Sequence, residues 1–457
     1  MSDRRLSYGF WLVLFALVLP AACYAAPDTV WTFRYAGTAG GDYQPLASFV
    51  DARSATGHVY VAGWAQQPMG GIDALLLKIS ADSGHLVWDK TYPDMTASGA
   101  AMDTSGNVYI AGVTTGTTAA GKICILKYLP SGDTTWTRTY SEQGLSFTSV
   151  GTIAIDDSQN VYACGRSDST VRIVKYLPNG MPANVMSYTL GGGMSFWHGN
   201  FHILGSEEAY LAMSVEHPTR WADWLVVKLS PDSRVVWERA YKDTGSTLER
   251  LQWSDVDERA NIYLTGDIVT SPIGADAFCT MKMDSAGTVQ WITEYDGPQN
   301  LRDMPRFLLF DRGSTYVGGW SMYQEMGEDQ AIALVKYDSL GDERWVRRYG
   351  SDDTTCDLGY EEIEGVPNFR SVNVDDSGVV YVTGYAYNRG TGVVGILLQY
   401  DQSGNLVSLR KLSVPGERWF GATVDFDNAG ALYNTGIAVR DNGYIDVFLT
   451  KYRGRQK

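Results

Sequence analysis

Residues 106–140 read GNVYIAGVTTGTTAAGKICILKYLPSGDTTWTRTY, and this stretch decides the fold that we predict for the chain. Its alternating and apolar runs predict β-strands at 107–113, 123–129 and 135–140, with a further strand before them around 100–103. The Pro-Ser-Gly-Asp segment at 130–133 favours a tight turn, because Gly and Asp adopt turn conformations at low cost. The stretch therefore predicts a unit of four strands.

The same unit recurs along the whole chain, as three landmarks show. The first is a Tyr followed three residues later by Gly, with Met213 in place of Gly in one copy. The second is a Lys before a new turn, with Gln399 filling one gap, and the third is a Trp followed four residues later by Tyr. The landmark residues are Tyr60, Tyr109, Tyr162, Tyr210, Tyr263, Tyr316, Tyr381 and Tyr433; Lys78, Lys127, Lys175, Lys228, Lys282, Lys336 and Lys451; and Trp88, Trp136, Trp237, Trp291 and Trp345, with weakened Trp copies at Asn184 and Ser408.

The last repeat lacks its Trp strand, and an orphan Trp strand stands at the other end of the chain, at residues 30–35. Pairing of the two ends would close a ring and remove the unpaired edges of an open array. We therefore predict an all-β fold, an eight-bladed β-propeller of four-stranded blades, closed by the N-terminal strand. Blade 8 would consist of roughly 416–452 plus 29–35. Seven blades plus a stray hairpin is the alternative count.

The N-terminus has the pattern of a secretory signal peptide. Arg4 and Arg5 precede an apolar run at 8–19, which is too short to span a membrane, and small residues follow through Ala26. We predict a signal peptide at 1–26, a single propeller domain at 27–457 whose residues 27–36 form the outer strand of the last blade, and a secreted or periplasmic location. Because Pro20 stands where a lipobox needs Leu, we do not expect acylation at Cys23. No other membrane segment is expected.

Composition restricts the function classes. A net charge of −15 argues against nucleic acid and against anionic lipid surfaces as partners. Cys124 and Cys279 fall on predicted third strands, Cys164 on a second strand and Cys356 in a predicted loop, and their spacing fits neither a disulfide framework nor a zinc site. We expect a monomer.

The repeat resembles a known family. The segments GHVYVAG at 57–63, DALLLK at 73–78, SG at 83–84 and VW at 87–88 resemble the bacterial SBBP-type β-propeller repeat. The Asp of this pattern, Asp73, recurs at Asp223 and Asp446, and one place earlier at Asp276. The resemblance covers roughly 46–457 and implies a propeller in an exported bacterial protein, without a catalytic residue to transfer. A weaker likeness to quinoprotein dehydrogenases implies a quinone and calcium, but the chain has no vicinal Cys pair to match them.

Residues that recur in every repeat favour structural roles over chemistry. The repeated Trp rings are expected to fill the wedges between blades, and the repeated Lys residues to lie at the surface or in ion pairs between blades. Asp residues at the first turns, such as Asp103 and Asp427, fit ordinary turns, although calcium binding there is an alternative. A metal pair at His198 and His202 is a second alternative. We therefore predict no catalytic residue, no metal site and no cofactor.

What differs between repeats is more informative about function, because function concentrates on loops held by a rigid scaffold. Two connections per blade reach one face, and several of them depart from the regular pattern, the longest being the acidic stretch 350–368 that leads into blade 7. The predicted ligand-binding residues on these connections are Phe196, Trp197, His198, Trp221, Tyr323, Tyr360 and Trp419.

These observations favour an exported, non-enzymatic propeller that binds or scaffolds an extracellular glycan or a cell-envelope protein through its loop-rich face. The alternative is a secreted enzyme that acts on an extracellular polymer, of glycosidase or lyase type, with carboxylates of the 350–368 stretch as acid and base. A quinoprotein-like dehydrogenase is the weaker alternative. Free variation of loops that only seal the channel mouth would also explain the pattern.

Overall fold

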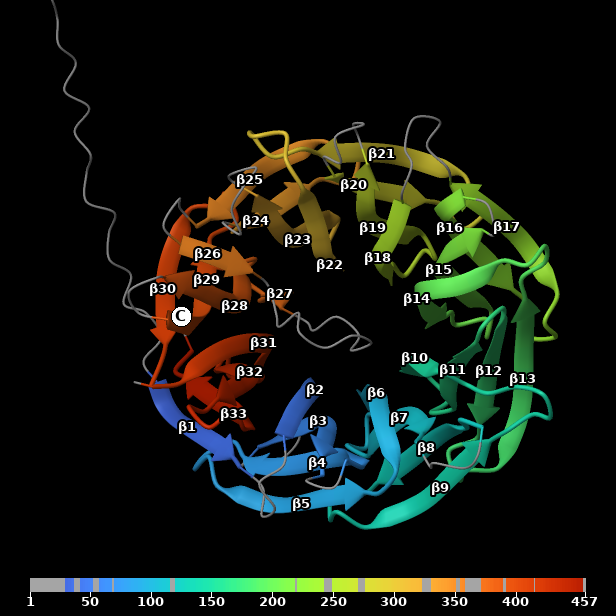
Figure 1. Ribbon diagram of the computed structural model, residues 1–457, viewed down its shortest axis with the longest axis horizontal. Coiled ribbons are helices and arrows are strands. Elements are labelled where there is room, and N and C mark those ends of the chain that lie inside the picture. The colour runs from blue at the N-terminus through green and yellow to red at the C-terminus, as the bar shows by residue number, and fades with distance from the viewer. Residues whose placement is uncertain are drawn as a thin grey trace, which may run out of the picture.

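The computed structural model of the protein is all-β, and its strands form a ring of radial blades (Figure 1). No helix occurs in the described part of the chain, so none there could cross a bilayer. The predicted signal peptide lies outside the described residues. The structure describes residues 29–36, 42–51, 57–67, 70–115, 120–217, 220–241, 249–269, 276–322, 330–350, 354–357, 371–388, 392–414 and 416–454.

Eight antiparallel sheets make up the blades, and each sheet runs from an inner strand near the ring axis to an outer strand at the rim. Blades 1 to 4 contain β2 (Asp42–Asp51), β3 (His58–Gln66), β4 (Ile72–Ser80) and β5 (Leu86–Tyr92); β6 (Met95–Met102), β7 (Val108–Thr114), β8 (Ile123–Tyr128) and β9 (Thr134–Tyr140); β10 (Ser149–Ile155), β11 (Val161–Ser167), β12 (Thr170–Tyr176) and β13 (Pro182–Thr189); and β14 (Ser195–Ile203), β15 (Ala209–His217), β16 (Arg220–Leu229) and β17 (Val235–Tyr241). Blades 5 to 8 contain β18 (Glu249–Val256), β19 (Ile262–Val269), β20 (Asp276–Met283) and β21 (Val289–Tyr295); β22 (Asp303–Asp311), β23 (Ser314–Met322), β24 (Gln330–Tyr337) and β25 (Glu343–Tyr349); β26 (Thr354–Asp357), β27 (Val372–Val374), β28 (Val380–Asn388), β29 (Gly392–Tyr400) and β30 (Leu406–Leu412); and β31 (Arg418–Phe426), β32 (Leu432–Val439) and β33 (Ile445–Tyr452) with β1 (Thr29–Tyr35).

The prediction of eight blades is confirmed, and the seven-blade alternative is wrong. β1 pairs antiparallel with β33 from Thr29↔Tyr452 to Tyr35↔Val447, so the orphan Trp strand completes blade 8 and closes the ring. The strands predicted at 107–113, 123–129 and 135–140 correspond to β7, β8 and β9 within one residue at each end. The strand predicted around 100–103 is the end of a longer strand, β6.

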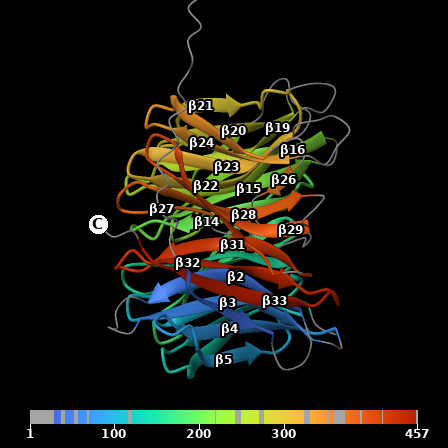
Figure 2. The same cartoon turned by 90° about the vertical axis from the view of Figure 1, so that its left-hand side faces the viewer.

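The connections divide the ring into two faces, which Figure 2 shows edge-on. The face that carries the turns from first to second and from third to fourth strands is called the tight-turn face here. The opposite face carries the connections from second to third strands and from each blade to the next, and is called the loop-rich face. Because every blade is an antiparallel meander, the two kinds of connection cannot mix.

The landmark residues join neighbouring blades at the tight-turn face. Each landmark Lys is the register partner of its Tyr on the adjacent strand, as in Tyr60↔Lys78. In seven blades the Lys ammonium lies 5.0–5.6 Å from the centre of the Tyr ring. Lys78, Lys127 and Lys451 also donate to a turn carbonyl of the next blade, as from Lys78 Nζ to Pro130 O at 2.7 Å. The prediction of surface positions or ion pairs between blades holds for Lys175, which pairs with Glu207 of the next blade, whereas Lys78 and Lys127 are buried against backbone carbonyls.

The landmark Trp residues fill the wedges between blades, as predicted. The Trp136 indole N–H donates to Pro178 O of the next blade at 3.2 Å, and its ring lies against Gly180 of the same turn. Gly180 has φ +80°, and a Cβ there would stand 2.8 Å from the ring, so glycine is required on both counts. Equivalent Trp to carbonyl bonds join Trp31 to Ala81, Trp237 to Ser285, Trp291 to Ser339 and Trp345 to Gln402.

The inner strands carry a shift in strand register, and blade 7 departs from the other blades at this position along the strand. The shift falls between Pro45 and Ala47 in blade 1, and at matching places in blades 2, 3, 5, 6 and 8. In blade 4 it falls between Phe196 and His198, two residues from the matching place. In blade 7 the inner strand is interrupted at the matching place: β26 pairs with the far part of β28, β27 pairs with its near part, and residues 358–370 between them are not described. The extra residues are therefore inserted inside the strand nearest the axis.

Two sequence expectations are corrected by blade 7. The long stretch at 350–368 was expected to be a connection leading into the blade, but residues 354–357 already form its inner strand. Cys356 was expected in a loop, and it lies instead in β26, fully buried. A strand of four residues followed by an insertion has no sequence pattern that separates it from a loop.

Candidate functional site

The loop-rich face is anchored by the Asp that begins the third strand of several blades. The carboxylate of Asp73 accepts hydrogen bonds from the Gln67 side chain and from the backbone N–H of Asp94, which belong to two different connections. Asp223 lies 3.0 Å from the imidazole of His217, and Asp276 accepts from Arg302 at 2.9 Å. An Asp at this repeated position thus fixes irregular connections of the loop-rich face through hydrogen bonds and ion pairs.

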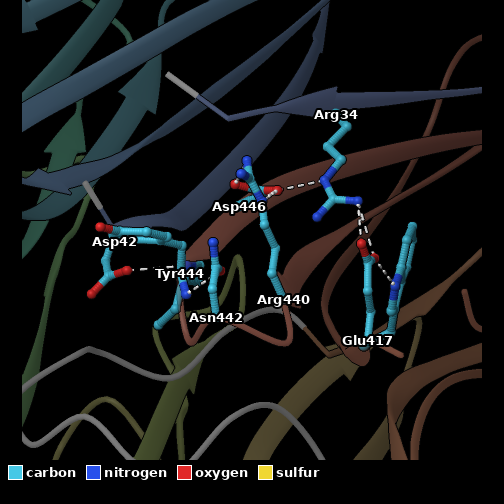
Figure 3. Close-up of polar contacts among 9 residues, drawn as sticks. Arg34, Asp42, Glu417, Arg440, Asn442, Tyr444 and Asp446 are labelled. Carbon is cyan, nitrogen blue, oxygen red and sulfur yellow. Dashed lines mark hydrogen bonds and ion pairs between the residues drawn. The ribbon is translucent and has the colours of Figure 1, made fainter. Parts of the chain in front are cut away.

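The densest of these anchors joins the two chain ends (Figure 3). Asp446, which is 1 % exposed, accepts a bidentate pair from Arg440 at 2.6 and 2.7 Å and a third bond from Arg34 of β1 at 2.5 Å. Arg34 also donates to both oxygens of Glu417 at 2.8 and 3.0 Å. Planar, bidentate pairs of this kind fix geometry as well as charge. The loop-rich end of blade 8 is therefore rigid.

Two exposed aromatic side chains lie at the loop-rich ends of blades 7 and 8. Tyr444, in the turn between β32 and β33, and Tyr387, near the end of β28, are each 43 % exposed. The turn that carries Tyr444 is held by a hydrogen bond from the Ile445 backbone N–H to Asp42 of blade 1 (Figure 3). Exposed aromatic rings on a rigid base are typical of surfaces that bind carbohydrate or protein.

Buried carboxyl groups with raised pKa values gather at one place on this face, the boundary between blades 5 and 6. Asp267 is fully buried, and burial raises its pKa to about 6. Its Oδ1 accepts a bond from Gln252 at 3.0 Å, and its Oδ2 meets no hydrogen-bond donor among the described residues. Asp303, which is 1 % exposed, also has a pKa raised by burial to about 6.

Perturbed carboxyl groups of this kind often mark functional sites. Here, however, Asp267 and Asp303 expose almost no surface, so neither could contact a polymer substrate in this arrangement. Within the described residues no group of three His, Cys, Asp or Glu side chains is placed to hold a metal ion. The boundary therefore offers two buried carboxyl groups with raised pKa values but no exposed acid–base pair.

The structure places the predicted ligand-binding residues unevenly. Phe196 and Trp419 are buried: the Phe196 ring lies 6.4 Å from that of Tyr188, and Trp419 packs 4.6 Å from Phe448 and donates to Glu417. Trp197 and His198 lie on β14 and Trp221 on β16, at the loop-rich end, without described side chains. Tyr323 and Tyr360 lie outside the described residues. Ligand contact at these seven positions stays a prediction.

The two alternatives for metal binding can be set against described geometry. His202 Nε2 lies 2.9 Å from Ser254 Oγ, and burial lowers the His202 pKa to about 4, whereas the side chain of His198 is not described. Asp103, in a first turn, accepts from the backbone N–H of Ser105 and Asn107, from the Asn107 side chain and from Tyr109. Its oxygens are thus engaged by the turn, which supports the interpretation as ordinary turns.

Sequence reasoning missed both Tyr387 and Tyr444, and it missed the carboxyl groups between blades 5 and 6. Tyr444 follows Asn442 and Gly443, a turn signal with an aromatic directly after it. Asp267 stands one residue after the landmark Gly, where most other repeats have an apolar or aromatic residue such as Trp64 or Trp320. A carboxyl side chain at a position that is apolar or aromatic in most repeats was the available signal.

Comparison with known proteins finds similar solved structures but no family for this chain. No protein-family model matches the chain, and no curated protein matches it. Similar solved structures include a protein from Lactobacillus plantarum (TM-score 0.47, 14% identity, 78% of this chain and 96% of the other) and the polysaccharide lyase Uly1 (TM-score 0.45, 10% identity, 95% of each chain). The periplasmic gluconolactonase PpgL of Pseudomonas aeruginosa is similar at TM-score 0.44 and 13% identity, over 82% of this chain and 99% of the other. At these levels the likeness carries no argument about function.

Proposed function

We propose that the protein is an exported, non-enzymatic β-propeller that binds or scaffolds an extracellular glycan or a cell-envelope protein through its loop-rich face. The observation that carries this proposal is the asymmetry of the ring. Short turns with engaged polar groups cover one face, whereas ion-paired anchors and exposed aromatic rings occupy the other. A face that served only to close the scaffold would need neither the ion-paired anchors nor the exposed rings.

Further features support the proposal. The N-terminal pattern of residues 1–26 and the resemblance to the SBBP-type repeat both favour export to the periplasm or the cell exterior. The exposed rings of Tyr387 and Tyr444 lie on neighbouring blades, and each offers a flat apolar face with a polar tip. Such rings stack on sugars and also anchor protein interfaces, so the two ligand classes share this surface.

The test is a double substitution, Tyr387→Ala with Tyr444→Ala, in the chain from residue 27 onward. Binding is measured by thermal shift against bacterial and plant oligosaccharides, and by retention of envelope proteins on the immobilised protein. We expect about tenfold weaker binding, because exposed aromatic anchors commonly contribute more than 1 kcal/mol. Unchanged binding would contradict the choice of surface.

The matched control truncates exposed apolar residues on the tight-turn face. Met181 and Leu340 are 57 % and 73 % exposed in turns between third and fourth strands. The variant Met181→Ala with Leu340→Ala should bind as the unmodified protein does. If the control loses binding and the Tyr variant keeps it, the partner uses the tight-turn face, and the proposal fails.

A further inference from the structure

The connection from blade 5 to blade 6, residues 296–302, is fastened to the loop-rich face by a pair of carboxyl groups. Asp296 begins the connection directly after β21, and Asp303 begins β22 directly after it. The two side chains are hydrogen-bonded to each other. Asp303 Oδ2 also accepts the backbone N–H of Gly297 at 2.5 Å, so both bonds hold the start of the connection.

A hydrogen bond between two carboxyl groups requires a proton on one of them, because an ionised carboxylate can only accept. The surroundings of Asp303 also favour its protonated form. Asp303 is 1 % exposed, and its hydrogen bonds from Ser321 and Gly297 offset only part of the cost of burying its charge. An ionised Asp303 would therefore place a poorly compensated charge next to a second carboxylate. The pair is stable as a proton-sharing unit.

The other groups that face the pair still favour one shared proton. Tyr295 of β21 and Ser321 of β23 are neutral, and Arg348 of β25 is the cation that acts on Asp303. The neighbouring Arg302 is engaged by Asp276, at 2.9 Å, on the facing blade. The pKa of Asp303 is raised to about 6, mainly by burial and also by the charge of Asp296. Burial likewise raises the pKa of Asp296. The charge of Arg348 thus opposes only part of the rise in the Asp303 pKa.

We infer that Asp296 and Asp303 form a proton-dependent latch that holds the 296–302 connection against the loop-rich face. When the shared proton is present, the connection is fixed by the carboxyl pair. When the proton leaves, two carboxylates face each other at hydrogen-bond distance, and their repulsion releases the connection. The inference goes beyond the proposed function, since it holds whatever partner binds the face.

The direction with pH follows from the raised pKa. A carboxyl group whose pKa is higher in the folded state than in the unfolded state stabilises the fold at low pH, and that contribution is lost as the pH rises through the folded value. The latch should therefore be closed near pH 5 and open above about pH 7, because burial and the second carboxyl group place the transition near 6. Because the pair shares one proton, a single transition is expected.

The test is hydrogen exchange of the chain from residue 27 onward, read by mass spectrometry between pH 5 and 8 and corrected for the intrinsic pH dependence of exchange. The amides of residues 296–302 should lose protection about tenfold as the pH rises. The connection at 141–148 is an internal control on the same face. It is held by Glu142 and Arg172, whose contact lowers the Glu142 pKa to about 2, so its protection should stay constant over this range.

Substitutions separate the latch from a general pH effect. In Asp303→Asn the amide can accept from Gly297 and donate to Asp296, so protection at pH 8 should equal that at pH 5. Asp296→Asn should give the same result, which keeps the test valid if one variant does not fold. Asp157→Asn, an exposed residue on the tight-turn face, matches the change of charge and should keep the pH-dependent loss. Constant protection of 296–302 in the unmodified protein, or an unaltered loss in both variants, would overturn the inference.

Discussion

The two faces of the ring use charged side chains in opposite ways. On the tight-turn face, a carboxylate such as Asp156 accepts bonds from its own turn, from the backbone and side chain of Asn160 and from Tyr162. On the loop-rich face, a carboxylate such as Asp446 or Asp276 binds arginines from other strands and connections. Local bonds thus engage a carboxylate within its own turn. Long-range pairs tie each connection to the rest of the face.

This difference suggests that the two faces of the ring have different roles. The tight-turn face carries the Trp and Lys contacts that join neighbouring blades, so it stabilises the scaffold. The loop-rich face varies from blade to blade and contains the carboxyl groups whose pKa is raised by burial. Substitutions on the first face should change stability without changing binding. Substitutions on the second should do the reverse, or should change how stability depends on pH.

The largest effect is expected for Trp136→Ala on the tight-turn face. The ring is 6 % exposed and fills the wedge between blades 2 and 3, and deletion of a buried aromatic side chain costs about 4 kcal/mol. Chemical denaturation should show a much lower midpoint. The control Trp136→Phe keeps a ring but loses the bond to Pro178, and should lose only about 1 kcal/mol. Similar losses in the two variants would show that the hydrogen bond, not the packing, joins the blades.

A smaller effect is expected for Asp156→Ala in a first turn. Burial opposes ionisation of Asp156, but hydrogen bonds from Asn160 and Tyr162 outweigh it and lower the pKa. Removal of the carboxylate leaves these donors without their acceptor, at a cost of about 2 kcal/mol at pH 7. The adjacent Asp157 is exposed, and Asp157→Ala should change the unfolding free energy by less than about 0.5 kcal/mol. Equal losses at both positions would mean that the bonds to Asp156 contribute nothing.

The smallest effect, and one of opposite sign, is expected for Asp267→Asn at the boundary of blades 5 and 6. Burial raises the Asp267 pKa to about 6, above its value of about 4 in an unfolded chain, so stability is lost as the pH rises from about 4 through 6. The variant should be more stable than the unmodified protein at pH 8, and its advantage should be about 1 kcal/mol smaller at pH 5. Thermal unfolding at the two pH values measures the difference. A loss of stability at pH 8 would show that the charge of Asp267 is needed by Arg250 nearby.

The fold could be predicted because its determinants are local and repeated. Tyr, Lys and Trp recur at fixed spacing since each blade must contact the next in the same way, so counting them gives the number of blades. The landmark Gly also has a local cause: a Cβ at Gly63 would stand 1.9 Å from Gln44 O of the inner strand. The orphan strand with Trp31 completed the count. The interruption of the inner strand of blade 7 could not be predicted, because nothing in Thr354 to Asp357 distinguishes a short strand from a loop.

The candidate site was far less predictable, since it depends on contacts between distant residues. Arg34 and Asp446 are 412 residues apart in the chain, and no spacing rule brings them together. Aromatic residues near loops were the basis of the predicted binding set, but nothing in the sequence separates the buried Trp419 from the exposed Tyr444. The exposure of a side chain at a strand end depends on the neighbouring blade.

The closure of the ring by β1 has a consequence for the order in which the chain folds. β1 pairs with β33, the last of the described strands, so Thr29 cannot meet Tyr452 until β33 has been made. Contacts of such large sequence separation slow folding, because chain entropy is lost before they form. Seven blades can assemble in sequence as the chain emerges, while the eighth remains one strand short with an open edge. Completion of the ring is thus a final step that requires both ends of the chain to be in the same compartment.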